Sequence, residues 1–201
     1  AFIASVFIAS VFIASGVVLG DEQLSLAAQQ SIDLRDEDDR PARVAILFDR
    51  SMSMGLPADD GRPRRTHADL ALAKLLAGLP IRTEFVFLAF NGQAIPMHER
   101  FLSLSSSRRR QVMQFAESLT PQGDTNCAES VGEALRRWPR LDAVFLITDG
   151  RAPNPMDGER QAETLGKIQQ KFGFQFNWII VDLPTTPNLR RMLQLSRGRR
   201  W

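Results

Sequence analysis

The sequence predicts an α/β fold of three layers, in which a mainly parallel sheet is covered by helices on both faces. Short apolar runs rich in β-branched and aromatic residues alternate with longer stretches compatible with helices, which is typical of parallel sheets. The dipeptide Asn91-Gly92 is a strong signal for a tight hairpin turn. We therefore expect one antiparallel strand at an edge of the parallel sheet.

The expected elements follow in chain order. Strands are expected at 43–48, 84–90, 93–99, 142–148 and 174–182. Helices are expected at 65–78, 106–118, 127–138, 158–171 and 187–196. Pro96 has no amide hydrogen to donate within a sheet, so the strand at 93–99 suits an edge position.

An apolar segment precedes the predicted domain. Residues 1–19 contain no charged residue and repeat the letters VFIAS. A helix of this length nearly spans the ~30 Å hydrocarbon core of a bilayer, so we expect a transmembrane or signal segment at 1–20. A buried or aggregation-prone β segment is the alternative, because Val, Ile and Phe recur.

The next segment is acidic, and the remainder of the chain is basic. Residues 21–40 contain seven acids and two arginines, a net charge of −5, whereas the whole chain carries +2. We interpret 21–42 as a linker and 43–201 as one domain, whose size is ordinary for a single core. No Lys or Arg lies between the apolar segment and Arg35, so the positive-inside rule favours an extracytoplasmic domain.

Hydroxyl and carboxylate side chains gather where two predicted strands end. Asp49 closes one apolar run and is followed by Ser51 and Ser53, Asp149 follows a second run, and Thr125 precedes a predicted helix. Taken singly, these residues would suit helix caps or turns. Ligands of open α/β sheets bind outside the carboxyl ends of the strands, and hard cations such as Mg²⁺ prefer oxygen ligands. The pattern therefore predicts a divalent cation site.

These residues resemble the metal-ion-dependent adhesion site of the von Willebrand factor type A (VWA) domain, as found in bacterial membrane-anchored VWA proteins. Asp49, Ser51 and Ser53 match its first motif, Thr125 its second and Asp149 its third. The resemblance covers most of the chain and implies a Rossmann-like fold. It implies that the serines and the threonine contact Mg²⁺ or Mn²⁺, that the aspartates act directly or through water, and that a partner's carboxylate often completes the coordination.

Several arginines flank the predicted site. Arg50 and Arg151 each follow one of its aspartates, and Arg62, Arg64 and Arg65 come after its serines. We expect them to form a positive rim that steers an acidic partner. Pairing with nearby acidic residues is an equally good interpretation.

Other chemistries are less consistent with the sequence. The run Arg108 to Arg110 lacks aromatic interleaving and a nucleic-acid-binding motif, so a solvated helix face explains it better than nucleic acid does. His67 and His98 are too far apart in sequence to suggest a zinc site. The single Cys127 permits no internal disulfide and suits a small buried position.

Three functions remain, and the first is favoured. It is a membrane-tethered binding domain that grips an acidic group of a partner protein through Mg²⁺ or Mn²⁺. The second is a scaffold in membrane-protein assembly that needs no metal. The third is a metal-assisted hydrolase, which the sequence disfavours because it offers no obvious general base or phosphate-binding glycine-rich loop; we expect no enzymatic activity.

Overall fold

The computed structural model describes residues 41–151, 155–172 and 174–181. The predicted apolar segment at 1–20, nearly all of the acidic linker and the predicted helix at 187–196 lie outside these residues. Within the described ranges, no helix combines the length and the apolar character needed to cross a membrane.

The described chain alternates strands and helices as the sequence predicts. In chain order the elements are β1 (Arg43–Asp49), the 3-10 helix η1 (Met52–Gly55), α2 (Arg64–Gly78), β2 (Glu84–Phe90), β3 (Ala94–Pro96), β4 (Leu102–Ser103), α3 (Ser106–Ser118), α4 (Cys127–Arg137), β5 (Ala143–Thr148), α5 (Pro155–Phe172) and β6 (Gln175–Ile180).

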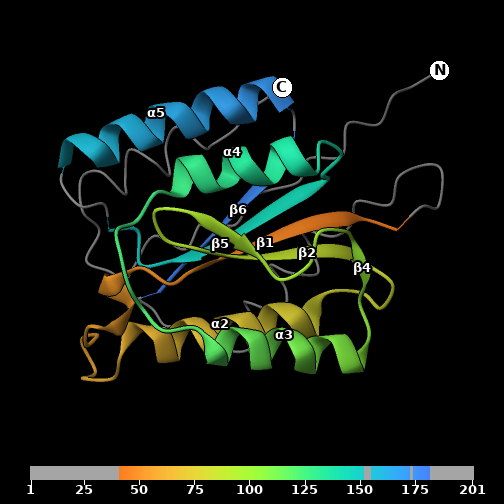
Figure 1. The fold of residues 1–201 in the computed structure, drawn as a ribbon, viewed down its shortest axis with the longest axis horizontal. Helices are drawn as coiled ribbons and strands as arrows, with labels where there is room; N and C mark the ends of the chain where they lie inside the picture. Colours follow the sequence, from red (N-terminus) through yellow and green to blue (C-terminus); the bar gives the residue numbers. More distant parts are fainter. Residues whose placement is uncertain (1–40, 152–154, 173, 182–201) are drawn as a thin grey trace, which may run out of the picture.

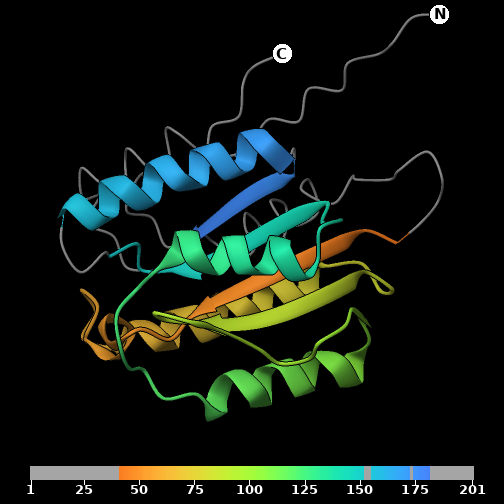
Figure 2. The same cartoon turned by 45° about the horizontal axis from the view of Figure 1, so that its top comes forward.

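The strands form one mixed sheet in the order β3-β2-β1-β5-β6. β1 pairs in parallel with both β2 and β5, and β6 pairs in parallel with β5. β3 and β4 each pair antiparallel with β2. Helices α2 and α3 cover one face of the sheet, and α4 and α5 cover the other (Figures 1 and 2). The prediction of a three-layer α/β fold with an antiparallel edge strand is confirmed.

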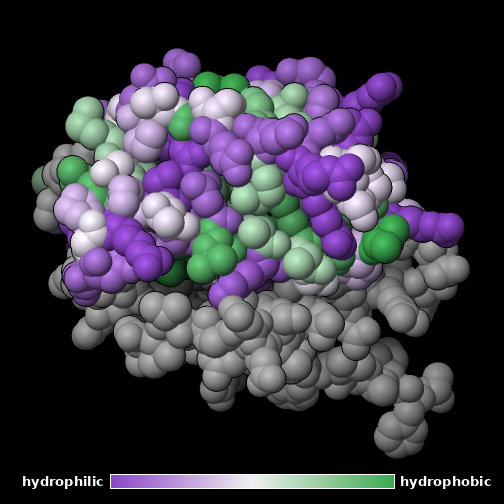
Figure 3. Space-filling view, turned by 90° about the horizontal axis from the view of Figure 1, so that it is seen from below, coloured by the Kyte–Doolittle hydropathy of each residue, from purple (hydrophilic) through white to green (hydrophobic). Residues whose placement is uncertain are grey.

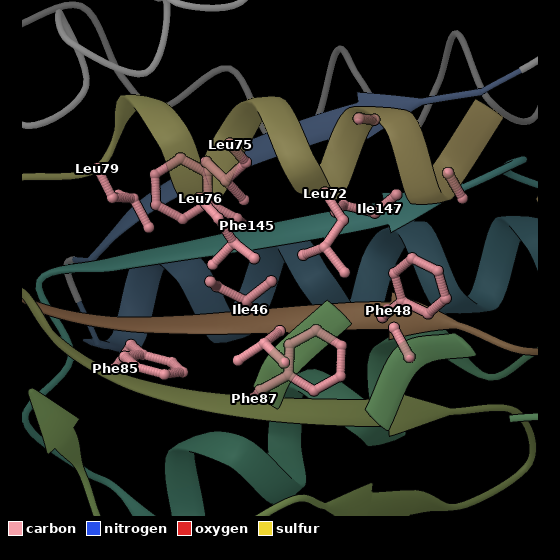
Figure 4. Packing of buried hydrophobic residues seen from close by; sticks show 14 of the residues in the cluster. Ile46, Phe48, Leu72, Leu75, Leu76, Leu79, Phe85, Phe87, Phe145 and Ile147 are labelled. Atoms are coloured by element: carbon pink, nitrogen blue, oxygen red, sulfur yellow. The ribbon is translucent and has the colours of Figure 1, made fainter. Parts of the chain in front are cut away.

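Alternate residues of the central strands pack against the two helical layers, because successive strand side chains point to opposite faces. Ile46 and Phe48 of β1 pack with Leu72 and Leu76 of α2 on one face (Figure 4). On the other face, Leu47 belongs to a second cluster that α4 and α5 complete. The central strands are buried on both faces and hold the ends of β1 and β5 in fixed positions.

The expected short strand around 93–99 is present but covers only Ala94–Pro96. β4 at Leu102–Ser103 was not expected. Pro96 cannot donate to a ladder, although Met97 still donates its amide to the Phe87 carbonyl at 2.8 Å. A strand of two residues is too short to show any periodicity.

Helices α2 and α3 are joined at both ends by arginine side chains. Arg65, in the first turn of α2, donates to the carbonyl of Leu119 at 2.8 Å and to that of Ala116, both at the C-terminal end of α3. Arg109, in the first turn of α3, donates to the carbonyl of Leu79 at the end of α2 at 3.0 Å. Each helix thus supplies hydrogen-bond donors to carbonyls at the C-terminal end of the other. Hydrophilic residues predominate on the described surface of this side of the molecule (Figure 3).

Candidate metal site

The predicted site lies at the topological switch point of the sheet, beside the end of β1. β1 has β2 on one side and β5 on the other, so the ends of β1 and β5 face the crevice in which open α/β sheets bind ligands. This edge is at the left of Figure 1, where η1 and the first turns of α2, α4 and α5 also lie. Asp49 is the last residue of β1, and Asp149 directly follows β5.

Asp49 is fully buried, and hydrogen bonds fix its carboxylate. Its Oδ1 accepts the backbone amide of Ser51 at 2.8 Å, and its Oδ2 accepts the hydroxyl of Thr148 at 2.5 Å. Burial raises the pKa of Asp49 from 3.8 to about 6, although these hydrogen bonds oppose the shift. The group is therefore held in one orientation and gains from any positive charge placed beside it.

The two serines lie in the turn between β1 and α2. The Ser51 and Ser53 hydroxyl oxygens are 3.1 Å apart. Ser51 is buried, whereas Met52 between the two serines is 65% exposed. The 3-10 turn thus directs the serine oxygens together and turns the intervening methionine outward.

The loop that carries Thr125 is tied to this turn by backbone hydrogen bonds. The Met52 amide donates to the Gly123 carbonyl at 2.9 Å, and the Gln122 amide donates to the Arg50 carbonyl at 2.8 Å. Thr125 itself is 6% exposed. The structure therefore holds the segment before Thr125 against the turn that carries Ser51 and Ser53.

Gly123 meets two requirements of this loop. Its φ of 73° lies in the left-handed region, which side chains other than glycine rarely adopt. A Cβ at this position would also lie 2.9 Å from the amide nitrogen of Asn91. That amide donates to the Gln122 carbonyl at 2.9 Å, so the close approach fastens the loop to the end of β2.

Gln161 of α5 fastens the other side of the threonine loop. Its amide nitrogen donates to the Thr125 carbonyl at 3.1 Å, and its amide oxygen accepts the backbone amide of Cys127 at 2.8 Å. Gln161 is 8% exposed and lies beside an open cavity of about 350 Å³, which Thr125, Asp157 and Arg160 also line. Cys127 is buried in the core, in line with its predicted role.

Asp149 has one oxygen without a hydrogen-bond partner. Its Oδ1 accepts the Arg151 amide at 3.1 Å, but its buried Oδ2 accepts no hydrogen bond. The guanidinium nitrogens Arg64 Nη1 and Arg151 Nε lie 3.8 and 3.9 Å from that oxygen. Burial raises the pKa of Asp149, and the Arg151 amide, the Ser53 hydroxyl and the two guanidinium charges oppose the shift.

The donor set fits a hard divalent cation. A buried carboxylate oxygen without a hydrogen bond calls for a cationic or hydrogen-donating partner. In the described part of the chain, no three side chains of His, Cys, Asp or Glu come close enough to hold a metal ion. A cation here would therefore need the hydroxyls of Ser51, Ser53 and Thr125 beside the carboxylates, which suits Mg²⁺ or Mn²⁺ better than zinc.

The five arginines predicted as a rim occupy different surroundings. Arg62 is exposed, with its Nε 3.8 Å from Asp60, and Arg151 is partly exposed beside Asp149. Arg50 is 9% exposed, and its Nε has no hydrogen-bond partner.

Two of these arginines point into the protein. Arg65 packs against α3, with its guanidinium 5.2 Å from the centre of the Phe48 ring. Arg64 is 5% exposed and donates to the Ser53 carbonyl at 3.0 Å. Neither side chain is placed to form an exposed rim, because backbone carbonyls inside the domain offer these cations better partners than water does.

Sequence reasoning missed two residues that support the site. Thr148 anchors Asp49, and its position at the end of an apolar run was a signal that we did not use. Gln161 anchors the threonine loop from the middle of α5, where no motif marks it. Only the tertiary structure shows the second residue.

Comparison with known proteins identifies the family. A sequence profile described as the von Willebrand factor type A domain matches residues 42–200. The chain belongs to the VWA domain family. No curated protein matches the chain.

Solved structures share the VWA fold at low sequence identity. An aerotolerance-related membrane protein from Bacteroides fragilis, with multiple mutations to serines, is 19% identical, with a TM-score of 0.56 over 78% of this chain and 89% of that one. The conserved hypothetical protein BatB from Bacteroides thetaiotaomicron is 17% identical, with a TM-score of 0.56 over 78% and 87%. Manganese-loaded Plasmodium vivax TRAP protein is 18% identical, with a TM-score of 0.53 over 80% and 65%. At these identities the likeness concerns the fold.

Proposed function

We propose that this VWA domain is a protein-binding module that holds Mg²⁺ or Mn²⁺ and captures a carboxylate of its partner. Asp49, Ser51, Ser53, Thr125 and Asp149 would hold the ion. The bound ion would supply a Lewis-acidic position for an anionic oxygen of the partner.

The buried Oδ2 of Asp149, which accepts no hydrogen bond, is the observation that carries the proposal. A carboxylate oxygen without a hydrogen bond is costly inside a protein, and such costs are commonly retained at binding sites. Asp49 adds a second buried carboxylate whose ionised form is disfavoured. A divalent cation would relieve both costs at once.

This chain's own residues would orient the site before the partner arrives. Thr148 and the Ser51 amide hold the Asp49 carboxylate, and Gln161 holds the loop of Thr125. Because these groups are already fixed, little ordering would be required on binding, which favours affinity.

The partner and the location follow from the charge and from the relatives. The metal position favours an acidic partner group, and Arg62 and Arg151 would favour its approach. The apolar residues 1–19 would tether the domain to a membrane, as the name of the Bacteroides fragilis relative suggests for that protein. We place the domain outside the cytoplasm and propose no role with nucleic acid.

A metal-independent scaffold in membrane-protein assembly is the second candidate. Arg64 and Arg151 near Asp149 favour it, because they already offset part of the negative charge without any ion. We propose a binding role rather than a catalytic one.

Calorimetric titration of Mg²⁺ and Mn²⁺ into the 201-residue chain tests the proposal, with Asp49→Ala as the variant. Thr148→Val serves as a comparison, because it removes only the hydroxyl that orients Asp49. Saturable binding that Asp49→Ala abolishes and Thr148→Val weakens is the expected result. A folded parent that binds neither ion would favour the scaffold.

A further inference from the structure

Arg64 is a buried cation whose backbone amide and guanidinium group each donate a hydrogen bond. Its backbone amide donates to the Leu56 carbonyl at 3.0 Å, and its Nη1 donates to the Ser53 carbonyl at 3.0 Å. Only 6% of its side chain is exposed, and its Nη1 is 3.8 Å from Asp149 Oδ2. Its guanidinium group therefore places a positive charge close to Asp149.

Two arginines set the charge of the site before any metal binds. Asp49 and Asp149 contribute two negative charges when ionised, and Arg64 and Arg151 contribute two positive charges beside Asp149 Oδ2. The Arg151 side chain is 39% exposed, so solvent screens it more than it screens Arg64. A divalent cation held by Asp149 therefore enters beside two guanidinium groups.

We propose that Arg64 makes metal binding depend on an anionic group from the partner. The inference rests on the proposed metal site and adds a condition to it. The ion alone would lie close to these guanidinium groups in a poorly solvated place, so it binds weakly. A carboxylate that binds together with the ion offsets this repulsion, so metal and acidic partner bind cooperatively, each raising the affinity of the other.

Arg64 and Arg65 offer a matched pair of variants. They are neighbours in the first turn of α2, but Arg65 is bound to α3 and Asp69. Arg64→Gln removes the charge near Asp149, and Arg64→Lys keeps it. Arg65→Gln removes a charge that the structure places against α3. Arg151→Gln, at a more exposed position, provides a second test if Arg64→Gln does not fold.

The experiment measures Mg²⁺ affinity by calorimetry in sodium chloride and in sodium acetate of equal ionic strength. Acetate is the minimal carboxylate probe. For the parent we expect affinity at least about threefold higher in acetate, the cooperative effect of an anion completing the site. For Arg64→Gln we expect affinity about tenfold above the parent in chloride, because a nearby positive charge is gone, with little further gain in acetate.

The control variants have their own expected results. Arg64→Lys and Arg65→Gln are expected to follow the parent, and Arg151→Gln to show a smaller change in the direction of Arg64→Gln. A parent that binds no Mg²⁺ while Arg64→Gln binds it would also support the inference. Binding by the parent that Arg64→Gln leaves unchanged or weakens would overturn the inference and leave the metal site standing. No binding by any folded variant in either salt would overturn both.

Discussion

Charged side chains have different hydrogen-bond partners at the carboxyl edge of the sheet and between α2 and α3. Between the helices, Arg65 and Arg109 each donate to carbonyls at the end of the opposite helix, although Arg109 Nε has no hydrogen-bond partner. At the carboxyl edge, Asp149 keeps an oxygen without a hydrogen bond, and Asp49 is so buried that its pKa rises.

The difference separates groups that stabilise the fold from groups that remain open to a ligand. Arg64 and Arg65 differ within one turn, since Arg65 binds two carbonyls of α3 whereas Arg64 donates to the Ser53 carbonyl and lies 3.8 Å from Asp149. Loss of a satisfied group should lower stability, and loss of an open group should lower binding.

The largest effect is expected for Asp149→Asn. The variant removes one of two buried carboxylate charges, and we expect Mn²⁺ affinity to fall by about three orders of magnitude, roughly 4 kcal/mol. The metal-free variant should have a stability close to that of the parent, because loss of a buried negative charge offsets loss of its pairing with Arg64 and Arg151. Calorimetry measures the first quantity and urea unfolding the second. A large loss of stability in the variant would show that Asp149 belongs with the structural groups.

The pH dependence of the metal-free protein should show the cost of Asp49. Its folded pKa of about 6 exceeds the ordinary value of 3.8, so between these values the folded state holds more protons than the unfolded state. The contribution of this group to stability is therefore greatest at low pH and falls by about 3 kcal/mol as pH rises through about 6. Urea unfolding of the parent and Asp49→Asn, with a chelator present, isolates the contribution. A difference between the two that does not change with pH would contradict it.

Arg65→Ala should lower stability and leave metal affinity nearly unchanged, the opposite of Asp149→Asn. Loss of its bonds to the carbonyls of α3 and of its contact with Phe48 should lower the free energy of unfolding by about 2–3 kcal/mol. Metal affinity should stay within twofold or so of the parent. Thermal unfolding and calorimetry together provide the measurement, and a variant that keeps its stability but loses metal would reverse the assignment.

Arg109→Ala should have the smallest effect. Its single bond to the Leu79 carbonyl suggests a loss of about 1 kcal/mol in the free energy of unfolding, with metal affinity unchanged. Arg108→Ala is a suitable control, because that side chain makes an exposed contact with Gln111. Equal stability of the two variants would show that the capping at the end of α2 contributes nothing.

Much of the fold could be predicted because its signals are local. The predicted strand at 84–90 and helix at 106–118 agree with the observed bounds, since apolar runs and helix periodicity persist over many residues. The three motifs could be placed at one edge because parallel strands end together there. Gln161 and the inward direction of Arg64 could not be predicted, since both depend on contacts between distant segments or on the path of one turn.

A crystal structure of the domain grown with Mn²⁺ tests the central claim most directly. We expect an anomalous peak bound by oxygens of the Ser51, Ser53 and Thr125 side chains and, directly or through water, by Asp49 and Asp149. Manganese bound elsewhere, or a folded domain without the peak in which Asp149 still faces Arg64 as it does here, would contradict the account.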